Sequence, residues 1–165
     1  MKNLLKFSGI IAVGLAVVAM ILMMATPVLT YTSGSKTYAI DGTAAIFGGD
    51  FKLAWTALLA WIFVLVALVV LIAGIVLPML KIKVPVAGIL NLVAVALLIV
   101  AGIFLFITKG AFVAANDDGS LIGALLGASL DQYGLGAGWV IGGILAIAGG
   151  VFAILPAAFD FVRKK

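Results

Sequence analysis

The sequence predicts an all-α membrane protein, a left-handed four-helix transmembrane bundle with a small extracellular β-hairpin. Three observations lead to this fold class. Of the 165 residues, 66% are hydrophobic and only 10% are charged, whereas a typical soluble domain has about 45–50% apolar and about 25% charged residues. Four stretches are apolar over the roughly 20 residues that a helix needs to cross a bilayer. Between the first two stretches lies a short β-prone segment.

The chain is expected to form a single four-span domain over residues 1–165. We place the spans at about 7–29, 53–80, 86–108 and 134–159, which leaves 30–52 and 109–133 as outer segments. The first span follows a basic start, but its apolar run exceeds the roughly 7–15 residues of a signal-peptide core, so we expect it to be retained. All prolines lie near span ends, and Pro156, the deepest, is the one placed to kink a helix.

Basic residues set the expected orientation in the cell membrane. One side carries three basic residues, Lys36, Lys52 and Lys109, together with five aspartates. The opposite side has a single acid and seven basic residues: Lys2, Lys6, Lys81, Lys83, Arg163, Lys164 and Lys165. Because short cytoplasmic loops and tails are enriched in Lys and Arg, both termini of this multi-pass protein are predicted to be cytoplasmic. The basic residues form small separate clusters rather than one patch, which argues against nucleic-acid binding.

The fourth span is unusually rich in glycine. Such residues are tolerated in transmembrane helices and allow neighbouring helices to approach closely. Small residues recur there every four positions: Gly134, Gly138, Gly142, Ala146 and Gly150. The simple interpretation is packing within one bundle. The functional hypothesis is that a second small face of this span contacts another subunit, because the glycines occupy more than one face.

Aromatic residues map to the outer half of the predicted bundle: Trp55, Trp61, Trp139, Tyr31, Tyr38 and Tyr133. We interpret them as an interface belt at the level of the lipid headgroups. Alternatively, the outer face contacts another protein, since Trp and Tyr are also enriched at protein interfaces.

Asn91 is the one strongly polar side chain in the core of a span. It is expected to form a hydrogen bond across the bundle, with a pore-facing position as the alternative.

Both outer segments carry local structure signals. In the first, β-prone TYT and KTYAI flank SGS, which predicts a hairpin turning at Ser33-Gly34. In the second, NDDGS is typical of a capped turn, and SLIGALLGASL is compatible with a short helix at the membrane interface. Calcium binding by Asn116, Asp117 and Asp118 is a weaker alternative, because their spacing does not match a calcium loop.

The sequence contains no cysteine, histidine or glutamate. This composition excludes disulfides and thiolate metal sites, and it removes the commonest general bases. No phosphate-binding, zinc-protease or serine-nucleophile motif is present either. We therefore expect no enzymatic activity and no cofactor or metal site.

With two outer segments, a short inner turn and cytoplasmic ends, the chain resembles the claudin-like group of four-span membrane proteins. The likeness is architectural, since the W-G-L-W signature and the cysteine pair of claudins are absent here. The composition and the AIDGTAAIFGGD loop also resemble uncharacterised small four-span proteins of Gram-positive bacteria. The resemblance implies a protein that assembles laterally or across membranes.

Three functional hypotheses follow. The first is a structural or scaffolding protein that self-associates through its small-residue helix faces and outer segments, with the lipid bilayer and itself as partners. The second is an accessory subunit bound to another membrane protein in a larger complex. The third is a channel or transporter whose conduit forms between subunits.

Overall fold

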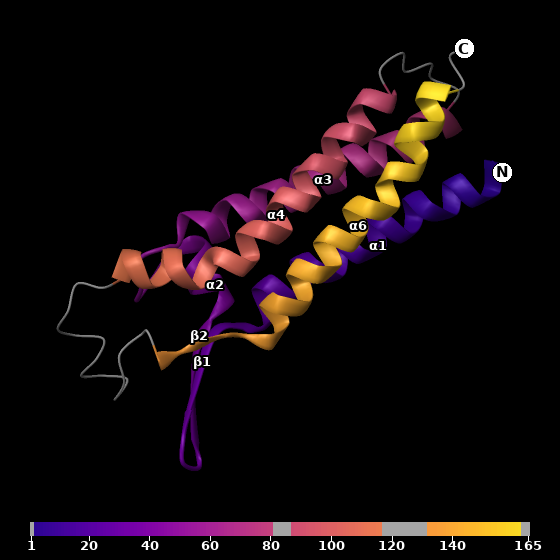
Figure 1. Cartoon of the computed structure of the whole chain (residues 1–165). Helices are drawn as coiled ribbons and strands as arrows, with labels where there is room; N and C mark the ends of the chain where they lie inside the picture. Colours follow the sequence, from indigo (N-terminus) through magenta and orange to yellow (C-terminus); the bar gives the residue numbers. More distant parts are fainter. Residues whose placement is uncertain (1, 81–86, 117–131, 163–165) are drawn as a thin grey trace.

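The computed structural model of the chain describes residues 2–80, 87–116 and 132–162 (Figure 1). The predicted interface helix at 120–130, the Asp117-Asp118 turn and the KIKVP turn lie outside these residues. The elements, in chain order, are α1 (Lys2–Ala25), β1 (Pro27–Ser33), β2 (Lys36–Asp41), α2 (Gly42–Phe47), α3 (Trp55–Met79), α4 (Ala87–Asn116), β3 (Gly134–Leu135) and α6 (Ala137–Val162).

Four long helices, α1, α3, α4 and α6, form the bundle, and each is long and apolar enough to cross a membrane. Helix α6 packs extensively against both α4 and α1, while α3 packs mainly against α4 and less against α1. The start of α1 and the end of α6 lie at one end of the bundle, here termed the inner end (Figure 1). The strands lie at the opposite, outer end. The chain thus has the architecture of a multi-pass, four-span membrane protein, and the left-handed sense of the bundle stays a prediction.

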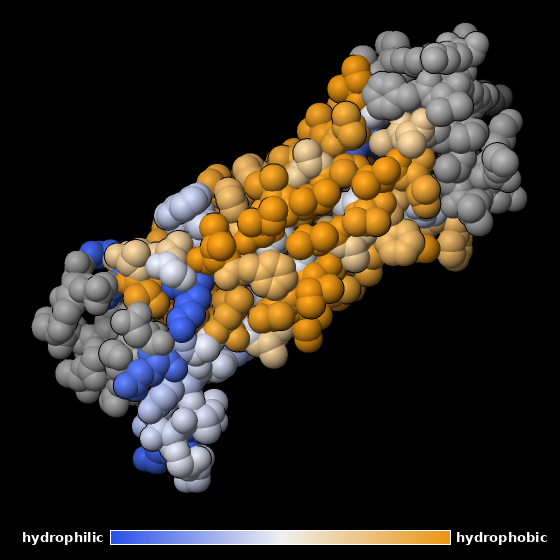
Figure 2. Space-filling model, viewed as in Figure 1, coloured by the Kyte–Doolittle hydropathy of each residue, from blue (hydrophilic) through white to orange (hydrophobic). Residues whose placement is uncertain are grey.

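Many of the buried positions of the bundle hold small residues, whereas many large aliphatic side chains are exposed. Large aliphatic residues such as Val69 and Ile144 are 60% and 55% exposed, and hydrophobic surface continues along the bundle in Figure 2. Alanines occupy many of the fully buried positions on the four helices: Ala12, Ala16, Ala19, Ala57, Ala60, Ala67, Ala94, Ala101, Ala146 and Ala153. This distribution suits a lipid solvent, in which close helix contact rather than water exclusion drives association.

The glycines of α6 lie at its contacts with two neighbouring helices, α1 and α4. A Cβ added to Gly149 would lie 3.4 Å from the carbonyl oxygen of Ala12 on α1. One added to Gly143 would lie 3.0 Å from the Phe106 ring on α4 and 3.3 Å from the carbonyl oxygen of Gly102. Since α6 sits between α1 and α4, glycine on more than one face is already required by packing within the monomer.

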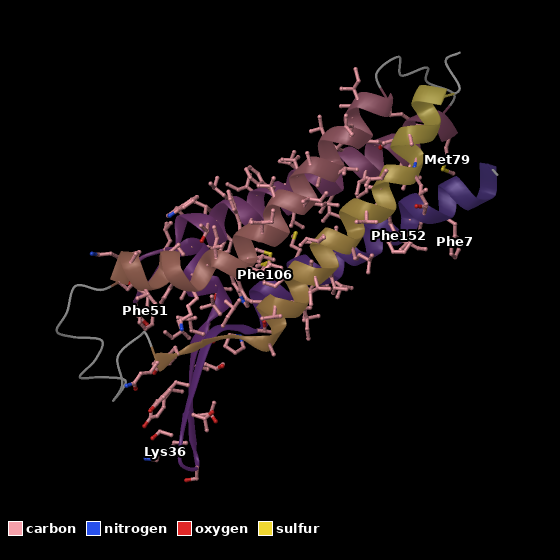
Figure 3. The ribbon with its side chains drawn as sticks, viewed as in Figure 1. Phe7, Lys36, Phe51, Met79, Phe106 and Phe152 are labelled. Carbon is pink, nitrogen blue, oxygen red and sulfur yellow. The ribbon has the colours of Figure 1, made fainter. Side chains whose placement is uncertain are left out.

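The outer sheet has three strands in the order β2-β1-β3, all antiparallel to their neighbours. The predicted hairpin is present, but its turn is Gly34-Ser35 rather than Ser33-Gly34, because Ser33 pairs with Lys36. Gly34 has φ +62°, a conformation that glycine adopts without strain. We call β1, the turn and β2, residues 27–41, the outer arm. It projects away from the end of the bundle, with Lys36 near its tip (Figure 3).

The structure corrects several predicted boundaries. Helix α1 ends at Ala25 rather than near Leu29, since Pro27 lacks an N–H and disfavours helical geometry in the residue before it. The last span begins at Ala137, because Gly134 and Leu135 form β3. Helix α4 continues past residue 108 to Asn116, so the start of the predicted second outer segment is helical. Its 30 residues span about 45 Å.

Candidate functional site

The root of the outer arm is a junction of α1, α2 and α6 in which main chains lie very close together. The Thr26 carbonyl accepts hydrogen bonds from the Gly42 N–H at 3.2 Å and from the Trp139 indole Nε1 at 3.4 Å. The Gly136 N–H donates to the Val28 carbonyl at 2.8 Å. We call this set of residues, with Pro27 and Gly138, the outer junction. It ties the arm to the end of α1 and to the start of α6.

Glycine is required at the outer junction for steric reasons. A Cβ on Gly136 would lie 2.0 Å from the Pro27 carbonyl oxygen, and one on Gly42 would lie 2.0 Å from the Met23 carbonyl oxygen. A Cβ on Gly138 would overlap the Thr26 side chain at 2.1 Å. Since two of these neighbours are backbone atoms that cannot rotate away, the junction fixes where the arm leaves the bundle.

Strand β2 has an open edge. Strand β1 is the centre of the sheet, and no described strand pairs with the other side of β2. The two-residue turn makes Ser33 and Lys36 the first hydrogen-bonded pair of the hairpin. In an antiparallel pair, every second residue directs its N–H and C=O groups toward the partner strand. Those of Tyr38 therefore point to β1, and those of Thr37 and Ala39 point to the open edge.

Within the part of the chain that the structure describes, the middle of this edge carries no charge and is not covered by another strand. Thr37 and Ala39 are exposed, and the strand is charged only at its two ends, Lys36 and Asp41. Protected edge strands generally carry charged side chains, a proline or a bulge, or are covered by another element. The irregularity in the β1–β2 register falls at Pro27–Leu29 on β1, at the root of the arm. The middle of β2 therefore presents main-chain groups that have no strand partner among the described residues.

Three tyrosines form a row across one face of the sheet. Tyr31 and Tyr38 are directly opposite in register, with ring centroids 6.4 Å apart, and the Tyr133 ring lies 5.3 Å from that of Tyr31. Tyr133 is fully buried, and its hydroxyl has no hydrogen-bond partner among the described residues. Burial, with smaller contributions from Tyr38 and Tyr31, raises the pKa of the Tyr133 phenol.

The side chain of Asn116, at the end of α4, forms hydrogen bonds with the loop before α3. The Asn116 Oδ1 accepts from the Lys52 backbone N–H at 2.7 Å, and Nδ2 donates to the Lys52 carbonyl at 2.9 Å. Nδ2 also lies 3.0 Å from the Phe112 carbonyl, and the Phe112 ring packs 5.7 Å from that of Phe51. The side chain that we considered as a calcium ligand thus binds a main-chain segment, while Asp117 and Asp118 lie outside the described residues.

The aromatic residues predicted as an interface belt occupy different environments. Trp55 is 55% exposed and contacts Phe104 edge-on, with ring centroids 5.6 Å apart. Trp61 is half-buried, with its Nε1 lacking a partner among the described residues. Trp139 and Tyr133 are fully buried, so they are packing residues of the outer end and are not available to headgroups.

The small residues predicted as a packing or oligomer stripe are mostly turned into the bundle. Ala146 is fully buried, and Gly142 and Gly150 are buried against neighbouring helices. Gly138 meets Thr26, and Gly134 lies in β3 opposite Thr30. Four of these positions thus lie at contacts within the chain, Gly134 is part of the sheet, and their role in self-association stays a prediction.

Polar side chains inside the bundle are also engaged. Asn91 is 6% exposed and packs against Gly74, where an added Cβ would lie 2.8 Å from its Oδ1. Thr56 donates to Thr108 at 3.2 Å between α3 and α4. Ser8 on α1 donates to a carbonyl of α6. No group of potential metal ligands occurs among residues 2–80, 87–116 and 132–162.

The fold and this outer end define a class, a four-span membrane bundle that carries a small three-stranded sheet. Comparison with protein-family models, curated proteins and solved structures gives no match. The class therefore rests on the architecture alone.

Proposed function

We propose that this chain is a structural membrane protein that associates with further copies of itself through its outer arm. The observation that carries the proposal is the open edge of β2. Its main-chain N–H and C=O groups at Thr37 and Ala39 are placed to extend the sheet, and strand addition to an exposed edge is a common mode of protein association.

The rest of the outer end supports this proposal. An arm that is fixed at its root by the outer junction loses little conformational freedom when it binds, and such preorganisation favours affinity. The small-residue faces of α6 pack against α1 and α4 within the chain. We therefore assign the contact between copies to the arm rather than to the helices. A second arm would also extend the tyrosine row.

We also propose where the chain lies in the cell. The helices cross a bacterial cell membrane, the inner end and both termini face the cytoplasm, and the arm faces outward. This organisation is claudin-like in the sense that the outer segments mediate assembly laterally or across membranes. In this proposal the chain binds no cofactor and catalyses no reaction.

Size analysis of the purified protein in mild detergent and in nanodiscs tests the proposal. Ala39→Pro removes one N–H from the open edge while leaving the β1–β2 hydrogen bonds in place, because proline is tolerated where a strand N–H faces solvent. Ala39→Ser is the matched control. We expect homo-oligomers for the wild type and Ala39→Ser, and monomers for Ala39→Pro.

Other results overturn the proposal. A wild-type monomer at all protein concentrations contradicts self-association. Stoichiometric co-purification of a different membrane protein supports an accessory subunit instead. Ion flux through liposomes that scales with the amount of oligomer supports a conduit between subunits.

A further inference from the structure

A hydrogen bond joins α1 to α6 near the inner end of the bundle. The Ser8 hydroxyl donates to the main-chain carbonyl of Phe152, with 2.5 Å between the two oxygens. Ser8 is only 5% exposed. Phe7 and Phe152 mark the two helices in this part of the molecule (Figure 3). The bond therefore connects segments that are 144 residues apart in the chain.

The Phe152 carbonyl is available because of Pro156. In an α-helix the carbonyl of residue 152 accepts from the N–H of residue 156, but proline has no N–H and its ring crowds the carbonyl four residues earlier. Pro156 lies inside α6. A carbonyl without a partner is costly in hydrocarbon, where water cannot replace the lost donor, and Ser or Thr side chains of neighbouring helices are among the groups that can.

We propose that Ser8 locks a proline hinge in α6. Its hydroxyl takes the place of the missing N–H of residue 156, so the helix bond lost to proline becomes a bond between helices. The turns of α6 that follow Phe152 are thereby held against α1. Without the hydroxyl, α6 is free to bend at Pro156 and the inner ends of the two helices move independently.

A double-mutant cycle tests this lock, with amide hydrogen exchange of α6 residues 153–158 measured by mass spectrometry in nanodiscs. Ser8→Ala is expected to speed exchange roughly three- to tenfold, the range for loss of one hydrogen bond. In a Pro156→Ala background the same change is expected to have no effect, because the new N–H of residue 156 binds the Phe152 carbonyl. Ser8→Thr keeps the hydroxyl and is expected to retain most of the protection.

A second proline provides the control. Pro78 lies near the end of α3, so a Pro78→Ala background is expected to leave the effect of Ser8→Ala unchanged. Equal effects of Ser8→Ala in the wild-type and Pro156→Ala backgrounds would assign Ser8 a packing role and overturn the proposal. An absence of effect in both backgrounds would overturn it as well. Neither result bears on self-association, which is measured separately.

Discussion

The bundle and the outer end of this protein use glycine for different purposes. Between the helices, glycine and alanine let the main chains approach, and contacts such as Gly149 to Ala12 leave about the space of a methyl group. At the outer junction, the main chains of Gly136 and Pro27 are already in contact and a hydrogen bond is made beside them. The glycines between the helices thus tolerate an added methyl group to different degrees, whereas the outer junction has no room for one.

The fold is specified more strictly at the outer junction than between the helices. In lipid, helices with many small residues have several acceptable ways to pack, since attraction comes from close contact along any small face. The outer junction adds directional constraints: the Thr26 carbonyl accepts two hydrogen bonds, and Gly42 lies beside it. Those constraints fix the position of the arm relative to the bundle.

The largest expected effect is at the outer junction. Gly136→Ala places a Cβ against the Pro27 carbonyl, which cannot move without breaking the strand pairing of β1. We expect a loss of at least about 3 kcal/mol, the upper end of overpacking costs, measured as thermal or SDS-induced unfolding in detergent. Gly14→Ala is the control, because no atom lies within 4 Å of its added Cβ. Equal stability of the two variants would show that the outer junction accommodates an added methyl group as readily as the open position of Gly14 does.

A smaller effect is expected between the helices. In Gly102→Ala the Cβ lies 2.5 Å from the flexible Ile147 side chain and 2.8 Å from the Gly143 carbonyl oxygen. We expect a cost of about 1–3 kcal/mol, because the side chain can yield and the helices can separate slightly. Gly142→Ala, whose nearest contact is 3.6 Å, is expected to be nearly neutral in the same unfolding assay. The reverse order would indicate a different pairing of α6 with α4.

The smallest effect concerns the buried tyrosine. Burial raises the pKa of Tyr133 above its ordinary value of 10.0. The unfolded chain therefore releases this proton first, and stability is expected to fall as the pH rises from about 10 toward the folded-state pKa. Tyr133→Phe is expected to change stability by less than about 1 kcal/mol at neutral pH, since it removes a hydroxyl without a described partner. In an unfolding series across alkaline pH, the variant should lose less stability than the wild type.

The sequence predicts the fold class well because the strongest signals are physical and local. Four apolar runs fix the helices, and TYT-SGS-KTYAI fixes the hairpin to within one residue at the turn. Strand β3 was missed because two residues beside a glycine-rich helix carry no alternation pattern. Helix α4 continues to Asn116, where Phe112 packs on Phe51 and Asn116 binds the Lys52 main chain, because the end of an apolar run does not mark the end of a helix.

The candidate site was only partly predictable. Small residues are so frequent that spacing alone cannot tell which face of α6 meets α1, which meets α4 and which faces lipid. Trp139 and Tyr133 are chemically suited to a headgroup belt, and only their packing places them in the interior. The link between Ser8 and Pro156 required the carbonyl of Phe152 as intermediate, a main-chain atom that no side-chain motif reveals.

Single-cysteine cross-linking in native membranes tests the self-association claim most directly, because the chain has no cysteine of its own. Ala39→Cys places a thiol on the open edge of β2, and Ile144→Cys places one on an exposed face of α6. We predict that oxidation or a short bifunctional maleimide converts the residue-39 variant into covalent dimers and leaves the residue-144 variant monomeric. Dimers formed only through residue 144, or through neither residue, would contradict assembly by the outer arm.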